Sequence, residues 1–178
     1  MADLELYLRG TPWFVPTVLI GVVLAAVILL TRRREHVVIS WLTVMSYVGF
    51  LAATVTPSGS EFHWDMQRSF SWSFHVPGPA EMLRMNYDTV NVWIALPMGA
   101  MTGYWAAARG RRRLVAIPFV VALAAELLQV LVPPLGRSAF LLADVANTWI
   151  GVAVGVLTGW MFARAFGVRA TSATRRAT

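Results

Sequence analysis

The chain has 178 residues, enough for one domain, and 57% of them are hydrophobic, with a mean hydropathy of +0.61. A soluble globular domain is only about 45–50% apolar, so this composition argues against a soluble protein. The absence of cysteine excludes disulfides and thiolate chemistry. The net charge of +6 does not indicate nucleic-acid binding, because the basic residues cluster beside apolar stretches.

Five apolar stretches follow one another along the chain. Each approaches the roughly 20 residues that a helix needs to cross a hydrocarbon core. They run at about residues 13–30, 37–56, 90–108, 114–132 and 141–163. A soluble domain would not carry five such stretches in succession. We therefore expect an all-α, polytopic transmembrane helical bundle that forms a single domain over residues 1–178.

The arginines predict the orientation of this bundle. All fifteen basic residues are arginine, and eleven of them fall within residues 32–34, 109–113 and 164–176, after the first, third and fifth stretches. Cytoplasmic segments of membrane proteins carry such an excess of basic residues. The N-terminus is then expected outside and the C-terminus inside, which requires an odd number of spans.

The connection between the second and third stretches, residues 57–89, is predicted to be a long outer loop rich in aromatic residues. Within it, Ser69 to His75 alternates with a period of two, as an extended segment does. One face of that segment would carry Phe70, Trp72 and Phe74. Two interpretations stay open: an aromatic belt at headgroup depth, or a lid over a site in the bundle. A short helix is predicted at residues 79–87, because Pro79 and Glu81 are typical of a first helical turn.

An internal repeat links the third and fifth stretches. The pattern Asp88-x-x-Asn91-x-Trp93-Ile94 recurs as Asp144-x-x-Asn147-x-Trp149-Ile150, an offset of 56 positions. Each stretch also has small residues at every fourth position, which lets helix backbones approach closely. These residues are Ala95, Gly99 and Gly103 in the third stretch and Gly151, Gly155 and Gly159 in the fifth. The alternative is chance similarity between apolar helices.

Polar residues gather toward the outer ends of the last three stretches. Glu126 and Gln129 are three apart and so share a helix face, as do Asp144 and Asn147, while Arg137 lies in the short loop between them. Together with Asn91 of the third stretch, these residues form a predicted outer polar layer. Its members are Asn91, Glu126, Gln129, Arg137, Asp144 and Asn147. Either these side chains bond to one another and pin the helices, or they line a pocket open to the outside. In the pocket, Arg137 would bind an anionic headgroup and Glu126 would carry a proton or a hydrogen bond.

A resemblance to a known family rests on these same residues. They are Asn91-x-x-x-x-x-Pro97-x-Gly99, then Glu126-Leu127-Leu128-Gln129, then Arg137, and finally Asp144-x-x-Asn147-x-x-x-Gly151-x-x-x-Gly155. In this combination, over about residues 90–160, the chain resembles the VanZ-like membrane proteins. The resemblance implies a bacterial plasma membrane location and a cell-envelope role linked to resistance to the glycopeptide teicoplanin. It implies no particular reaction.

Three functions are consistent with the sequence. The first is a non-enzymatic envelope protein that binds an amphiphile, such as a lipid-linked cell-wall precursor or a lipoglycopeptide. The second is a membrane enzyme that acts on a lipid headgroup with Glu126 as acid and base, and the third is a structural or assembly factor. Membrane lipids are the expected partners, and nucleic acid is not. No cofactor or metal is expected, because the sequence has no glycine-rich phosphate loop and its three histidines are scattered.

Overall fold

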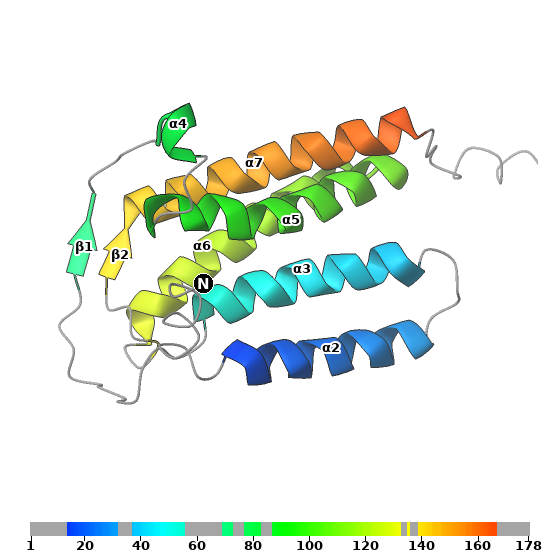
Figure 1. Ribbon diagram of the computed structural model, residues 1–178, viewed down its shortest axis with the longest axis horizontal. Helices are drawn as coiled ribbons and strands as arrows, with labels where there is room; N and C mark the ends of the chain where they lie inside the picture. The colour runs from blue at the N-terminus through cyan, green and yellow to red at the C-terminus, as the bar shows by residue number, and fades with distance from the viewer. Residues whose placement is uncertain are drawn as a thin grey trace, which may run out of the picture. The chain divides into compact units, whose positions relative to one another are not determined.

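A computed structural model describes residues 14–31, 37–55, 69–72, 77–82, 87–132, 135 and 139–166 of the chain. Helices make up most of this part (Figure 1). In chain order the elements are α2 (Phe14–Thr31), α3 (Val37–Val55), β1 (Ser69–Ser71), α4 (Pro79–Met82), α5 (Tyr87–Ala108), η1 (Arg112–Val115), α6 (Ala116–Leu131), β2 (Ala139–Leu141) and α7 (Leu142–Ala165).

The predicted helical class is confirmed, and each of the five apolar stretches forms a helix. Among the described residues, three helices are long and apolar enough to cross a membrane: Val37–Val55, Arg112–Leu131 and Leu142–Ala165. A shorter apolar helix covers Val15–Val27. Of the short helix predicted at residues 79–87, the described residues are Pro79–Met82, which form α4, and Tyr87, which begins α5.

The chain divides into two compact units. The first consists of residues 1–76 and 123–146, and the second of residues 77–122 and 147–178. The boundaries cut through α6 and α7, so each of these helices contributes one end to the first unit and the rest to the second.

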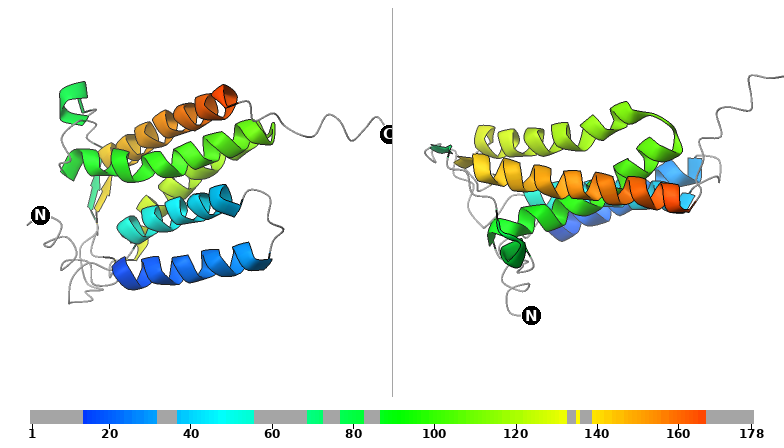
Figure 2. Two further views of the ribbon diagram at one scale, coloured as in Figure 1. Left: turned by 45° about the vertical axis from the view of Figure 1, so that its right-hand side comes forward. Right: turned by 90° about the horizontal axis from the view of Figure 1, so that it is seen from above.

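In the first unit, α2 and α3 lie side by side and run in opposite directions (Figures 1 and 2). This arrangement follows from the short connection between them. Gly21 permits their close contact, since a Cβ there would overlap the side chain of Val48. Farther along the chain, Val130 of α6 packs against Val145 of α7, with Leu123 beside them.

Two short strands were not predicted as a pair. β1 lies parallel to β2, with Ser69 opposite Ala139, Phe70 opposite Phe140 and Ser71 opposite Leu141. The extended conformation predicted for the aromatic segment is thus found at Ser69–Ser71. Parallel strands are joined by a long crossover connection, so they are not neighbours in the sequence as the strands of a hairpin are. Their pairing therefore leaves no local pattern in the sequence. The pairing attaches the aromatic segment to the residues that lead directly into α7.

In the second unit, α5 and α7 run in the same direction and touch through their glycines (Figure 2). A Cβ at any of five glycines would overlap backbone of the other helix. The close neighbours are the carbonyl groups of Val152 for Gly99, Val156 for Gly103, Val92 for Gly151, Leu96 for Gly155 and Ala100 for Gly159. The small-residue faces predicted to build the bundle therefore do so for this helix pair.

These contacts follow the internal repeat. Each glycine meets the residue three positions before its own counterpart in the other helix. Gly99, for example, corresponds to Gly155 and contacts Val152, whereas Gly155 corresponds to Gly99 and contacts Leu96. The same relation holds for all five glycines, so an approximate two-fold axis along the helices relates α5 to α7. The repeat predicted from sequence is therefore also a repeat of packing.

The end of α5 is a Schellman motif. The N–H of Arg111 donates to the carbonyl of Ala106, and the N–H of Gly110 donates to the carbonyl of Ala107. Gly110 has a φ of 63°, the left-handed conformation that such an ending requires. The motif reverses the chain within a few residues and leads through η1 into α6.

Candidate functional site

Glu126 and Gln129 lie on one face of α6 within the first compact unit. Both side chains are almost completely buried, with exposed fractions of 2% and 1%. Oε2 of Glu126 is shielded from solvent. A carboxylate and an amide are therefore held inside a helix that is otherwise apolar. Burying a carboxylate or an amide away from water costs free energy. Such groups therefore usually have hydrogen-bonding partners or serve a function.

The side chain of Gln129 reaches across to α3. Its Nε2 donates a hydrogen bond of 2.6 Å to the backbone carbonyl of Thr54. Thr54 belongs to the last turn of α3, where carbonyl groups have no partner within the helix. The amide thus replaces the missing helical bond. The hydroxyl of Thr54 is satisfied separately, by donating to the carbonyl of Phe50 at 2.8 Å.

Asp144 lies in the first turn of α7 and is half-buried. A carboxylate at that position is stabilised by the free N–H groups of the helix start. Val145, the next residue, packs on Val130, which itself follows Gln129. This apolar contact joins the start of α7 to the part of α6 that carries Glu126 and Gln129.

The aromatic segment lies beside the entry to α7. Phe70 and Trp72 are 58% and 71% exposed, so their rings present an apolar surface. Ser71 pairs with Leu141, only three residues before Asp144. The predicted lid residue Phe74 and the predicted anion-binding Arg137 lie outside the described residues.

Asn91 and Asn147 belong to the second unit, and both are buried. Asn147 precedes Gly151 by one helical turn, and Gly151 contacts the carbonyl of Val92, the residue after Asn91. The two asparagines, which are counterparts in the repeat, therefore mark the same end of the α5–α7 interface.

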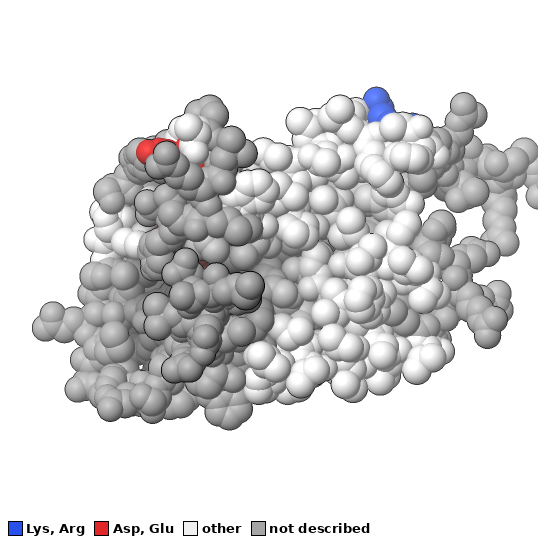
Figure 3. Space-filling model, in the orientation of Figure 1, with Lys and Arg blue, Asp and Glu red and all other residues white. Residues whose placement is uncertain are grey.

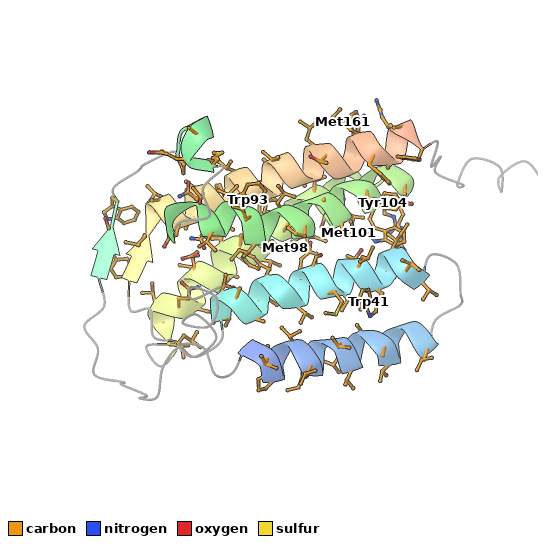
Figure 4. The ribbon with its side chains drawn as sticks, viewed as in Figure 1. Trp41, Trp93, Met98, Met101, Tyr104 and Met161 are labelled. Atoms are coloured by element: carbon orange, nitrogen blue, oxygen red, sulfur yellow. The ribbon has the colours of Figure 1, made fainter. Side chains whose placement is uncertain are left out.

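The repeat-related tryptophans also have matching roles. Nε1 of Trp93 donates to the carbonyl of Met82 in α4 at 2.8 Å (Figure 4), and Nε1 of Trp149 donates to the carbonyl of Phe119 in α6 at 3.2 Å. The ring of Trp149 packs edge-on against that of Phe119, with their centroids 5.9 Å apart. Each tryptophan thus ties its helix to a different neighbouring element.

Several buried threonines were missed at the sequence level: Thr54, Thr89, Thr102 and Thr148. Threonine is common in apolar helices because its hydroxyl can bond to the carbonyl four residues back. Thr102 does so, donating to Met98 at 2.9 Å. Thr89 lies two residues before Asn91 and Thr148 directly follows Asn147, which is the signal that could have drawn attention to these two.

Within the described ranges, no three His, Asp or Glu residues lie together in a way that could hold a metal ion. The chain matches no protein-family model, no curated protein and no solved structure in the comparisons made. What the described part offers chemically is a buried carboxylate, buried amides and an exposed aromatic strand. Such groups can bind a polar headgroup by hydrogen bonds, and the strand can contact an apolar tail.

Proposed function

We propose that the chain is a multi-pass protein of the bacterial plasma membrane, with five spans, the N-terminus outside and the C-terminus inside. Three long apolar helices support this, as does the helical state of all five apolar stretches. Exposed side chains of the helices are largely apolar, among them Leu30 at 86% and Leu131 at 60%. On the face shown in Figure 3, few charged atoms interrupt the described surface.

We further propose that the protein is VanZ-like and binds an amphiphile at the outer leaflet. The ligand class is a lipid-linked cell-wall precursor or a lipoglycopeptide, and the expected phenotype is glycopeptide resistance. The observation that carries the proposal is the burial of Glu126 and Gln129 on one face of α6. Asp144, which belongs to the same compact unit, and Arg137 in the loop between α6 and α7 complete the proposed pocket.

The exposed aromatic strand supports a ligand with an apolar part. Its pairing with β2 puts Phe70 and Trp72 beside the start of α7, close in the chain to Asp144. An amphiphile needs both kinds of contact, because its headgroup must be hydrogen-bonded and its tail must stay out of water.

A second candidate is a structural or assembly factor whose polar residues only pin helices. The bond from Gln129 to Thr54 favours it, since this amide already completes the end of another helix. Interhelical hydrogen bonds of this kind stabilise membrane proteins by about 1 kcal/mol.

The orientation can be tested directly because the chain has no cysteine. Single variants Trp72→Cys and Arg111→Cys would be exposed to a membrane-impermeant maleimide on intact cells. We expect labelling at position 72 and none at position 111 until the membrane is opened. Labelling of position 111 from outside would reject the proposed orientation.

The function can be tested with Glu126→Gln and Arg137→Gln, alone and together. Each variant would be assayed for teicoplanin resistance and for binding of a fluorescent lipoglycopeptide by the purified protein. A binding pocket predicts loss of both with expression and melting temperature near the parent values. Variants that no longer accumulate in the membrane would instead support the pinning role. Gly49→Ala is a suitable control, because a Cβ at Gly49 meets no atom within 4 Å.

A further inference from the structure

The ends of α5 and α7 each carry a tryptophan followed four residues later by an arginine. The guanidinium carbon of Arg109 lies 4.2 Å from the ring centroid of Trp105. That of Arg164 lies 3.7 Å from the ring centroid of Trp160. Both are cation–π contacts, in which the ring face attracts the charge. The stacked guanidinium still presents the N–H groups on its edge to another ligand.

The helix contacts hold these two pairs at one end of the second unit. Gly103 packs on Val156 and Gly159 packs on Ala100, in the last part of each helix. Because α5 and α7 run in the same direction, both tryptophan–arginine pairs come at the same end. Backbone contact at the glycines brings the two helix ends close together.

The charge at this end is strongly positive. Besides Arg109 and Arg164, the exposed basic residues of the turn and of η1 are Arg111, Arg112 and Arg113. The acidic residues in the described part of this unit are Glu81 in α4 and Asp88 in the first turn of α5. Asp88 is some 21 residues before Arg109, which is roughly 30 Å along a helix. Among the described residues of this unit, the arginines at this end therefore have no carboxylate nearby to balance their charge.

An apolar ridge runs along α7 next to this charge. It consists of exposed Leu157 and Met161, which share a helix face with Arg164, and Met161 points outward in Figure 4. Phe162 and Phe166 are also exposed but lie on the other side of the helix, where their rings stack with centroids 4.3 Å apart. A cationic end that continues into an exposed apolar ridge matches a molecule with an anionic head and a hydrocarbon tail.

We propose that this end of the α5–α7 pair binds an anionic phospholipid of the cytoplasmic leaflet. Arg109 and Arg164 contact the phosphate oxygens, and the ridge on α7 contacts an acyl chain. Guanidinium groups suit this role because their paired N–H groups match phosphate oxygens. The inference rests on the membrane-spanning arrangement proposed above and is independent of the outer polar pocket.

The test uses the full-length protein purified in a mild detergent with a mixture of phosphatidylglycerol and phosphatidylcholine. Native mass spectrometry counts the lipids of each class that stay bound. We expect phosphatidylglycerol to be retained in preference, and Arg109→Gln and Arg164→Gln each to weaken that retention about fivefold. Arg68→Gln removes the same charge from the predicted outer loop and should leave retention unchanged.

Three results would overturn the proposal. They are equal retention of both lipids, an unchanged preference in the Arg109→Gln/Arg164→Gln double variant, and a loss of the same size in Arg68→Gln. Competition by 10 mM inorganic phosphate or by RNA at the same arginines would also reject it in favour of a soluble anion. Failure here is distinct from failure of the outer pocket, because resistance and lipoglycopeptide binding are measured with Glu126 and Arg137 variants on the same preparations.

Discussion

The amide of Gln129 in α6 donates to the carbonyl of Thr54 at the end of α3, across 75 positions of sequence. Both residues are buried, so the amide supplies a partner that water cannot supply. This bond joins the second and fourth helical stretches at their predicted outer ends. Gln129, which the sequence predicted as a pocket residue, therefore also caps the end of α3.

Replacing Gln129 by leucine should destabilise the protein by about 1–3 kcal/mol, because a buried carbonyl loses its partner. Thr54→Val should cost less. It removes the hydroxyl that bonds to Phe50 but keeps the backbone carbonyl that receives the amide. Thermal unfolding in detergent, followed by circular dichroism, compares the two. Equal losses in both variants would mean that the bond to the carbonyl contributes nothing of its own.

Gly155→Ala should weaken the contact between α5 and α7. The added methyl group would overlap the backbone of Leu96 and Ala100, and backbone cannot rotate away as a side chain can. Overpacking of this kind typically costs about 1–3 kcal/mol. The matched control Gly49→Ala adds the same group in open space and should leave the melting temperature unchanged or slightly higher. A Gly155→Ala variant as stable as Gly49→Ala would disprove the close approach of the two helices.

Trp93→Phe and Trp149→Phe keep an aromatic ring but remove the N–H that donates to a carbonyl. Each should lower stability by about 1 kcal/mol. The loss should be greater for Trp93, whose bond to Met82 is 2.8 Å long and part-buried, than for Trp149, whose bond of 3.2 Å is exposed. Urea or heat denaturation in detergent measures the order, and the reverse order would count against these two bonds.

Glu126→Gln should leave the fold intact, since an amide has nearly the same shape and can still form hydrogen bonds at this buried position. Glu126→Ala should cost more, because it leaves a cavity as well as the loss of polar contacts. The informative measurement pairs melting temperature with teicoplanin resistance. Resistance lost in Glu126→Gln at an unchanged melting temperature indicates a working site, and resistance retained in that variant indicates a purely structural carboxylate.

Helix positions were predictable from hydropathy because long apolar runs have few other stable conformations in a membrane. The predicted second stretch, residues 37–56, differs from α3 by a single residue. The pairing of β1 with β2 was not predictable, because it joins segments 70 positions apart and nothing in a three-residue strand specifies its partner. The role of Thr54 was hidden for a similar reason. Its backbone carbonyl, common to every residue type, is the group that matters.

The internal repeat of the third and fifth stretches carried more information than its matching residues alone. The spacing predicted that these small-residue faces pack in the bundle, and the glycine contacts show that they pack against each other in the register of the repeat. Asn91 and Asn147 are buried in helices, and their place in the predicted outer polar layer stays a prediction.

The glycine faces of α5 and α7 are nearly the same, and each glycine on one face meets a carbonyl of the other. Such a face is self-complementary. α5 therefore carries both halves of the interface, and so does α7. During synthesis α5 is made well before α7. Until α7 is made, the glycine face of α5 could pair with the α5 of a second chain almost as well as with α7. The short distance between the two helices in the sequence gives the partner within the same chain a high effective concentration. We therefore expect the α5–α7 pair of one chain to form ahead of a pair made by two copies of α5.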